Sequence, residues 1–267
     1  MQLKRNALGF SLVELAVVFV IISVLVGGAL FTLSAQIEQR NIEQTQRRLE
    51  TAQETILGFA IVNGRLPCPA RYVSDTDHSA GLESFCDAAS GSCTPTTETR
   101  THGNCSNFYD GYVPAVALGL PVDAKGLATD AWGNRLRYAI ARSVTGCTVT
   151  PPADTRIWTS KDNLRTYGIS CRPNDLDVCN AAPAVGATAC TSAARVISTQ
   201  TVALIVYSTG KNGRLGGQGA DELENTDGND PVFVMRTPTE SPAYDDQLLV
   251  VPIGVLYSRL IAAGVLP

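Results

Sequence analysis

The sequence has little of what most enzymes and nucleic-acid-binding proteins are built from. Only two histidines, His78 and His102, occur in 267 residues, and both lie in polar, loop-like sequence. The motifs G-x-S-x-G and H-E-x-x-H are absent, and Lys and Arg form no cluster beyond single pairs. The formal net charge of -4 offers no basic surface for a nucleic acid. We therefore expect neither an enzyme nor a nucleic-acid-binding protein.

No C-x-x-C pair occurs among the eight cysteines, which argues against a zinc site. Their even number, all beyond the N-terminal apolar segment, is typical of disulfides in an exported protein. Many connectivities are open to eight cysteines. Short separations favour three pairs, and a fourth would staple the end of a long helix to the head, so the preferred set is Cys86–Cys93, Cys147–Cys171, Cys179–Cys190 and Cys68–Cys105.

Charge is also missing from residues 15–33, which follow a short basic leader, MQLKRNALG. As a helix this stretch is roughly 28 Å long, enough to cross the hydrocarbon core of a bilayer. Lys4 and Arg5 would stay in the cytoplasm and place the rest of the chain outside it. A secretory signal peptide is the alternative, with a weak cleavage sequence at residues 33–35. That alternative leaves Glu14, at the start of the apolar run, unexplained.

Residues 36–63 are polar but continue the helical pattern. Gly64, with Pro67 and Pro69 just beyond, predicts where the helix stops. Apolar or small residues recur at alternating spacings of three and four and predict one face that packs on a sheet: Ile42, Thr45, Leu49, Ala52, Ile56 and Phe59.

The rest of the chain predicts a head that is rich in strands. Residues 71–107 are rich in Ser, Thr, Asp and Cys and predict a disulfide-stapled loop. Residues 130–141 predict a turn that leads into a strand, and residues 202–209 predict a buried strand before a glycine-rich loop. Two further strands are predicted in residues 231–236 and 246–252, and a short helix in residues 253–263.

The stretch GFSLVEL after the basic leader resembles the class III signal peptides of type IV prepilins and type II secretion pseudopilins. In that family a prepilin peptidase cuts after the glycine and methylates the new terminal amine. The resemblance implies cleavage after Gly9 and an N-methylated Phe10. It also implies that Glu14 is the acid that pairs with the terminal amine of a neighbouring subunit during assembly.

Parts of the head also resemble major pseudopilins. These are the D-x-W-G-N-x-x-x-Y element at residues 130–138, the NGRLP that closes the long helix, and the loop YSTGKNGRLGGQGADELE. The resemblance implies an α+β, pilin-like fold, in which a long N-terminal helix packs on an antiparallel β-sheet. Segments 71–107 and 142–195 lie outside the resemblance and read as insertions. The expected parts are a leader (1–9), a transmembrane and assembly helix (10–35), its amphipathic continuation (36–64) and a disulfide-stapled periplasmic head (65–267).

The glycine-rich loop, residues 210–230, fits neither a P-loop nor a dinucleotide fingerprint. It is dense in hard oxygen ligands, which suit calcium, and in the resembled family this loop precedes a calcium site. The alternative is a solvated turn whose glycines supply positive φ. The oxygen-bearing residues are Asp221, Glu222, Glu224, Asn225, Asp227, Asn229 and Asp230, with Asp245 and Asp246 nearby, and the expected ligand set is Asp221, Asn225, Asp227 and Asp230.

The expected function is that of a structural subunit of a type IV pilus or a type II secretion pseudopilus. Its expected place is the inner membrane, as a single-pass protein with a periplasmic head, and then a periplasmic or extracellular filament. Expected partners are homologous subunits, prepilin peptidase, the inner-membrane assembly platform, and a secreted substrate or surface ligand. A membrane-anchored periplasmic binding protein, or a tip or adhesion protein, is the alternative.

Overall fold

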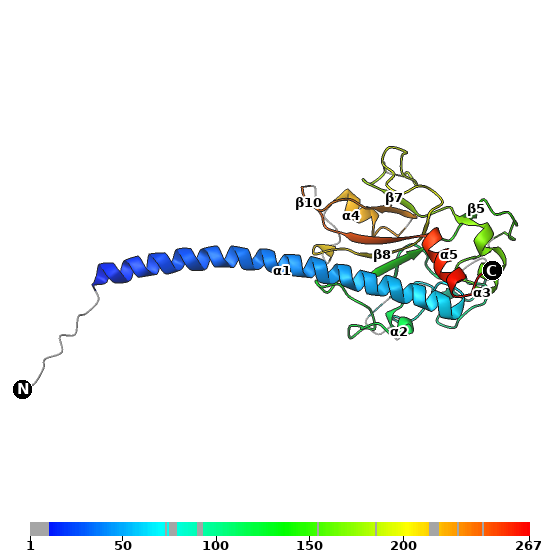
Figure 1. Cartoon of the computed structure of the whole chain (residues 1–267), viewed down its shortest axis with the longest axis horizontal. Helices are drawn as coiled ribbons and strands as arrows, with labels where there is room; N and C mark the ends of the chain where they lie inside the picture. The colour runs from blue at the N-terminus through cyan, green and yellow to red at the C-terminus, as the bar shows by residue number, and fades with distance from the viewer. Residues whose placement is uncertain are drawn as a thin grey trace, which may run out of the picture. The chain divides into compact units, whose positions relative to one another are not determined.

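Two compact units make up the molecule, and each is described by itself. The computed structural model describes residues 11–267 except residues 73, 75–78, 90–92, 154, 185, 214–218, 229 and 242, and it leaves out the side chains of residues 26–33. The first unit is Met1–Glu43, and the second, here called the head, is Gln44–Pro267. One helix, α1 (Leu12–Asn63), contributes to both units (Figure 1).

In the first unit, α1 is an exposed helix. Its residues up to Leu25 are exposed, with Leu12 at 86% and Val24 at 69%. Proline, which would break the backbone ladder, does not occur in α1. Within the part of the chain that the structure describes, no helix has a long enough apolar stretch to cross a membrane. The predicted leader and Phe10, the first residue of the predicted transmembrane segment, lie outside the described residues.

The second half of α1 belongs to the head and confirms most of the predicted apolar face. Thr45, Leu49, Ala52 and Ile56 are at most 1% exposed, whereas Phe59 is half-buried and Ile42 is exposed. The helix ends at Asn63, as predicted, because Gly64 adopts a left-handed φ of 69°. The Gly64 N–H donates to the Ala60 carbonyl at 2.9 Å and closes the last turn.

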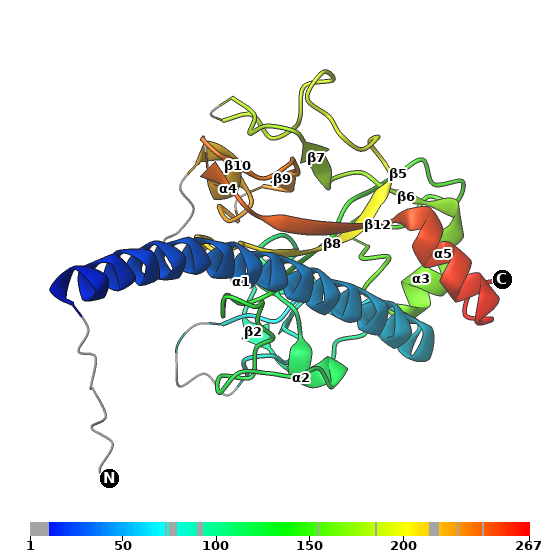
Figure 2. The same ribbon diagram turned by 60° about the vertical axis from the view of Figure 1, so that its left-hand side comes forward.

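A four-stranded antiparallel sheet forms the centre of the head, in the order β12 (Gln247–Pro252), β8 (Val202–Ser208), β4 (Arg137–Ile140) and β3 (Gly111–Tyr112). All seven residues of β8 are buried, as expected of a strand covered on both faces. The second half of α1 lies across this sheet (Figure 2) and shares one apolar core with it. The predicted strands at 202–209 and 246–252 are confirmed.

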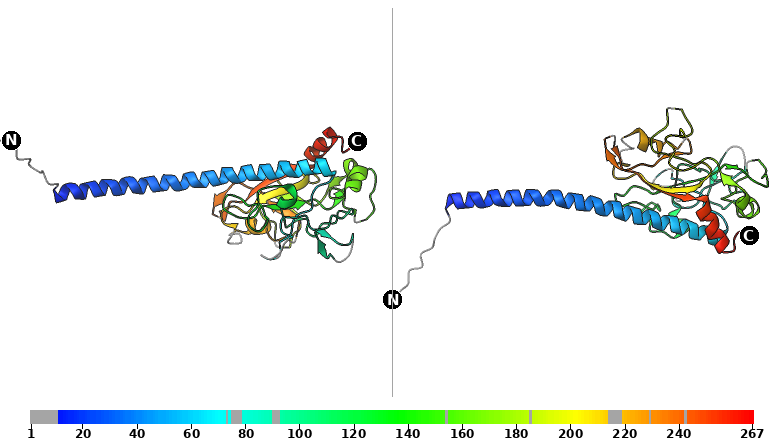
Figure 3. Two further views of the ribbon diagram at one scale, coloured as in Figure 1. Left: turned by 90° about the horizontal axis from the view of Figure 1, so that it is seen from below. Right: turned by 45° about the horizontal axis from the view of Figure 1, so that its top comes forward.

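Helix α5 (Ile253–Ala262) follows β12 directly and confirms the predicted C-terminal helix. It lies beside the end of α1 (Figure 3), and its Leu256 and Leu260 are fully buried. The Tyr257 hydroxyl accepts from Trp158 Nε1 at 3.3 Å and lies 2.9 Å from the Cys171 carbonyl. This hydroxyl therefore ties α5 to the 142–195 segment.

Short elements fill the rest of the head. One pair departs from the antiparallel expectation, because β7 (Asp177–Cys179) runs parallel to β9 (Val232–Val234). In their described part, residues 71–107, predicted as a loop, contain only short strands. The remaining elements are β1 (Phe85–Cys86), β2 (Pro95–Thr96), α2 (Ala115–Leu118), β5 (Val144–Thr145), α3 (Lys161–Tyr167), a 3-10 turn (Gly168–Ser170), β6 (Arg172–Pro173), α4 (Ala220–Glu224), β10 (Thr239–Glu240) and β11 (Ala243–Tyr244).

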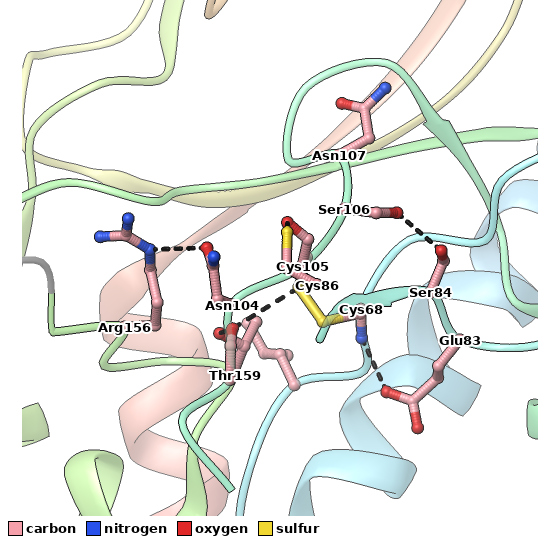
Figure 4. Close-up of a disulfide and its surroundings, with 12 residues drawn as sticks. Cys68, Glu83, Ser84, Cys86, Asn104, Cys105, Ser106, Asn107, Arg156 and Thr159 are labelled. Atoms are coloured by element: carbon pink, nitrogen blue, oxygen red, sulfur yellow. Dashed lines mark hydrogen bonds between the residues drawn. A yellow bond between two sulfur atoms is a disulfide. The ribbon is translucent and has the colours of Figure 1, made fainter. Parts of the chain in front are cut away.

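All eight cysteines are paired, and the pairs are those that the sequence favours: Cys68–Cys105, Cys86–Cys93, Cys147–Cys171 and Cys179–Cys190. Figure 4 shows the first of them beside Glu83, whose carboxylate accepts from the Cys68 N–H at 2.7 Å. The two insertions also contact each other, since Arg156 Nε donates to the Asn104 side chain at 3.2 Å. Disulfides and hydrogen bonds therefore stabilise segments that carry little regular structure.

Candidate functional site

The predicted processing site, Gly9–Phe10, lies outside the described residues, but the residues that follow it have a defined arrangement. Ser11 precedes the first helical residue, Leu12. The Ser11 N–H donates to the Glu14 carboxylate at 2.9 Å, and the Glu14 N–H donates to the Ser11 hydroxyl at 3.2 Å. This reciprocal pair is a capping box, which satisfies two N–H groups that a helix start leaves open.

The capping box gives Glu14 a structural role within its own chain. Its carboxylate lies in the first turn of α1, where a negative charge complements the helix dipole. Glu14 and Ser11 are both exposed, so the carboxylate is also accessible to a partner. The arrangement places an accessible anion one helical turn from the position where cleavage would create an amine.

A second arrangement involves the D-x-W-G-N element of the head. The Asp130 carboxylate accepts from the Trp132 and Asn134 N–H groups at 2.9 and 2.7 Å, which folds residues 130–134 into a tight turn. Gly133 has a φ of 86°, which explains the glycine. The Ser208 hydroxyl at the end of β8 donates to Asp130 at 2.6 Å. The element is thus a buried polar junction between the turn and the central strand.

This junction positions the loop after β8. The Asn134 side-chain amide donates to the Gly210 carbonyl. Gly210 has a φ of 62°, and a Cβ there would overlap the Asp245 carboxylate. Only glycine fits both the positive φ and the close approach to Asp245. The glycine therefore lets the loop pass close to the acidic residues that precede β12.

Two of the four predicted calcium ligands are held by other protein groups. Asp221 forms an ion pair with Arg236. Asn225 is 2% exposed, and its amide accepts from the Val234 N–H at 2.7 Å and donates to Asp246 at 2.7 Å. Asn225 therefore acts as a clamp between β9 and the segment before β12.

The other predicted ligands, Asp227 and Asp230, lie with Asp221 around Glu224. Burial, followed by the charges of Asp230, Asp227 and Asp221, raises the pKa of Glu224 to about 7. Asp227 is exposed, and Asp230 accepts from the Val232 N–H at 2.9 Å. Asp227 lies at the surface, whereas the Asp221 side chain is only 14% exposed and Glu224 Oε1 is buried without a hydrogen-bond partner among the described residues.

A tighter carboxylate group is formed by Glu222, Asp245 and Asp246. Each offers an oxygen within 4.8 Å of the others, and Glu222 and Asp246 are 1% and 5% exposed. The Asn212 side-chain amide donates to both Glu222 oxygens, at 3.0 and 2.8 Å. Asp246 Oδ2 accepts from Asn225, while Oδ1 has no hydrogen-bond partner among the described residues. We call these three residues the carboxylate triad.

Within the described head, the carboxylate triad contains the carboxyl group with the largest rise in pKa, that of Asp246. Burial raises the pKa of Asp246 to about 8, with further contributions from the charges of Glu222 and Asp245 that outweigh the Asn225 hydrogen bond. The raised pKa favours the protonated form of Asp246 when no cation is bound. A cation bound among the three carboxylates would displace that proton.

Sequence reasoning included the triad among the oxygen-bearing residues but selected their neighbours as ligands. Glu222 follows Asp221 on α4, so the two side chains diverge by about 100° and only one of them faces the interior. Asp245 and Asp246 reach the loop because β12 pairs with β8. The sequence feature that could have indicated the triad is the pair of adjacent acids, Asp245 and Asp246, at the start of the strand predicted in residues 246–252.

Comparison with known proteins adds one result. Residues 4–30 match the family model of the prokaryotic N-terminal methylation motif. No curated protein and no solved structure matches the chain. The match covers Lys4 and Arg5 of the leader, the predicted cleavage site and Glu14. This N-terminal motif supports the resemblance to the type IV pilin and pseudopilin family.

Proposed function

We propose that the chain is a structural subunit of a type IV pilus or a type II secretion pseudopilus. Prepilin peptidase would cut it after Gly9 and methylate Phe10, and the subunit would then assemble through α1 with homologous subunits on an inner-membrane platform. The observation that carries the proposal is the methylation motif at residues 4–30. The exposed apolar start of α1, with the accessible Glu14 in its first turn, supports it.

The mass of the mature N-terminus tests the proposal. In cells that make a prepilin peptidase, we expect a chain that starts at Phe10 and carries one methyl group on its amine. Gly9→Leu removes the small residue before the cut and is expected to leave the leader attached. An N-terminus at Gln36 would contradict the proposal, because it would identify an ordinary secretory signal peptide.

The carboxylate triad supports a second proposal, that the head binds calcium. Calcium prefers carboxylate and carbonyl oxygens on a flexible loop. Glu222, Asp245 and Asp246 supply three carboxylates, and the unpartnered Asp246 Oδ1 is a buried acceptor that a cation would satisfy. These residues replace the set predicted from the sequence as the proposed ligands. The cation would stabilise the loop after β8 rather than take part in chemistry.

Chelation tests the calcium proposal. With calcium at about 100 times its Kd, the free energy of unfolding is expected to rise by about 2.7 kcal/mol, and the Tm by about 5–10 °C. EGTA should reverse the change. The change should be smaller at pH 6 than at pH 8.5, because below its raised pKa Asp246 holds a proton that calcium must displace.

Two matched variants decide between the ligand sets. Asp246→Asn removes a carboxylate of the triad and is expected to abolish the calcium-dependent Tm change. Asp227→Asn makes the same chemical change at an exposed residue of the set predicted from the sequence and should leave the change intact. If Asp227→Asn abolished the Tm change and Asp246→Asn kept it, the calcium ligands would be the residues around Glu224. If calcium did not change the Tm of the wild-type chain, the proposal that the head binds calcium would be wrong.

A further inference from the structure

Three hollows on the head adjoin one another, and each pair of them shares a side chain. Their volumes are about 530, 390 and 310 Å³. Arg142 lines the first and the third, Ser143 the first and the second, and Tyr109 the second and the third. We call these three adjoining hollows together the Arg142 groove.

The walls of the groove come from the two insertions, and disulfides hold them. Cys147 lines the first hollow, and Cys86, Cys93 and Cys105 line the third. The second hollow includes residues 188 and 189, next to the Cys179–Cys190 disulfide. Hydrogen bonds between the insertions add to this, as Figure 4 shows for Arg156 and Asn104. A surface held in this way loses little conformational entropy when a ligand binds.

Polar groups that suit a hydroxylated ligand recur along the groove. The acidic groups in it are already engaged by protein donors. Asp175 accepts from the Tyr109 hydroxyl at 2.9 Å, and Asp177 forms two hydrogen bonds with Arg195 at 2.8 and 2.9 Å. The lining side chains with hydroxyl or amide groups include Thr145, Thr150, Thr188 and Gln200, whereas Asn104, Ser106 and Asn107 in the third hollow are already hydrogen-bonded to protein groups.

Arg142 supplies an exposed positive charge in the groove, and the buried Arg156 also lines the first hollow. The Arg142 guanidinium lies 5.7 Å from the centre of the Phe108 ring, and the residue is exposed. No ion pair engages this guanidinium among the residues that the structure describes. Stacking on an aromatic ring orients the planar guanidinium and leaves its N–H groups for an anion, to which arginine binds through two parallel hydrogen bonds.

We propose that the Arg142 groove binds a carboxylated oligosaccharide, with Arg142 holding a sugar carboxylate and the hydroxyl and amide groups holding sugar hydroxyls. Three adjoining hollows suit consecutive sugar units. An extended peptide is less suited, because peptide recognition relies on a free strand edge or on apolar side-chain pockets. This binding is separate from filament assembly, and it assigns a function to the insertions that the family resemblance does not cover.

Calorimetric titration of the purified full-length chain tests the proposal. The probes are trigalacturonate, an alginate trisaccharide and sialyllactose, with maltotriose as the neutral sugar and an oligoglutamate peptide as the non-sugar anion. We expect saturable binding of at least one carboxylated sugar, about tenfold or more tighter than that of maltotriose and of the peptide, since hydrogen bonds to a charged group are strong.

Variants locate the binding. Arg142→Gln should weaken it about tenfold or more, whereas Arg142→Lys should keep part of it. Arg165→Gln makes the same change at an exposed arginine of α3 outside the groove and should have no effect. Glu14→Ala should also have no effect, which separates this proposal from filament assembly. Failure of all three carboxylated sugars to bind, tighter binding of the peptide, or equal losses in Arg142→Gln and Arg165→Gln would overturn it.

Discussion

Glu14→Ala is expected to yield a chain that is cleaved and methylated normally but is excluded from filaments. In the proposed subunit, cleavage would leave a positive amine at Phe10, and assembly would bury that amine against neighbouring helices. Without the Glu14 carboxylate the buried amine has no counter-charge, and loss of one partner of a buried ion pair costs about 3–5 kcal/mol. The corresponding loss in the association constant is more than about a hundredfold. Immunoblots of sheared filaments and of the membrane fraction measure the distribution.

The capping box provides the control for this prediction. Ser11→Ala removes the hydroxyl that accepts from the Glu14 N–H and is expected to cost the helix start about 0.5–2 kcal/mol. Glu14 remains, so filaments should still form. If both variants assembled equally poorly, the acid would act through its own helix and not through a neighbouring subunit. Normal assembly of Glu14→Ala would contradict this role of the acid, whereas a binding protein that uses the helix mainly as an anchor would keep its full function in that variant.

Glu83→Ala is expected to lower the free energy of unfolding of the head by about 3–5 kcal/mol. Glu83 accepts two hydrogen bonds from Arg65, at 2.6 and 2.8 Å, and the two side chains are each only 10% exposed. The same carboxylate accepts from the Cys68 N–H. The Arg65 guanidinium lies between the rings of Phe59 and Phe85, at 5.2 and 5.3 Å. The variant therefore leaves the buried Arg65 cation without its counter-charge, with one hydrogen bond to the Leu66 carbonyl remaining, and it removes the acceptor of the Cys68 N–H.

Denaturant unfolding under oxidising conditions measures this loss, and a surface ion pair provides the comparison. Glu54→Ala removes the partner of Arg259, 3.3 Å away, where both side chains are more than half exposed. Such pairs contribute at most about 1 kcal/mol. The double variant Arg65→Leu with Glu83→Leu should recover much of the loss, because it removes both buried charges. Equal effects of Glu83→Ala and Glu54→Ala would contradict the prediction.

Local sequence predicts those elements of this head that depend on local chemistry. The stop of α1 at Gly64, the buried strand at residues 202–208 and the helix after Pro252 all follow from glycine, periodicity and proline. Three of the cysteine pairs follow from short separations, and Cys68–Cys105 follows from the expected staple between the end of the long helix and the head. The parallel pairing of β7 with β9 could not be predicted, because Asp177 and Val232 are distant in the chain and nothing in either segment specifies its partner.

The candidate cation site was predictable as a region but not as a ligand set. Composition marks residues 210–230 as rich in oxygen ligands. Two features decide which acid side chain faces the interior. They are the rotation of α4 about its axis and the pairing of each carboxylate with an arginine. Arg236 engages Asp221, and that leaves Glu222 for the interior. Contacts of this kind between distant residues carry no signature in a single sequence.

The turn at residues 130–134 has a consequence for how the head responds to binding. Arg48 of α1 donates to the Thr129 carbonyl at 2.8 Å and also to the Asp130 carbonyl, and Asn134 holds the loop whose Gly210 packs on Asp245. A chain of hydrogen bonds and close contacts therefore joins a helix surface to the carboxylate triad. If calcium at the triad changed the affinity of this part of α1 for a partner, that partner would change the affinity for calcium by the same factor.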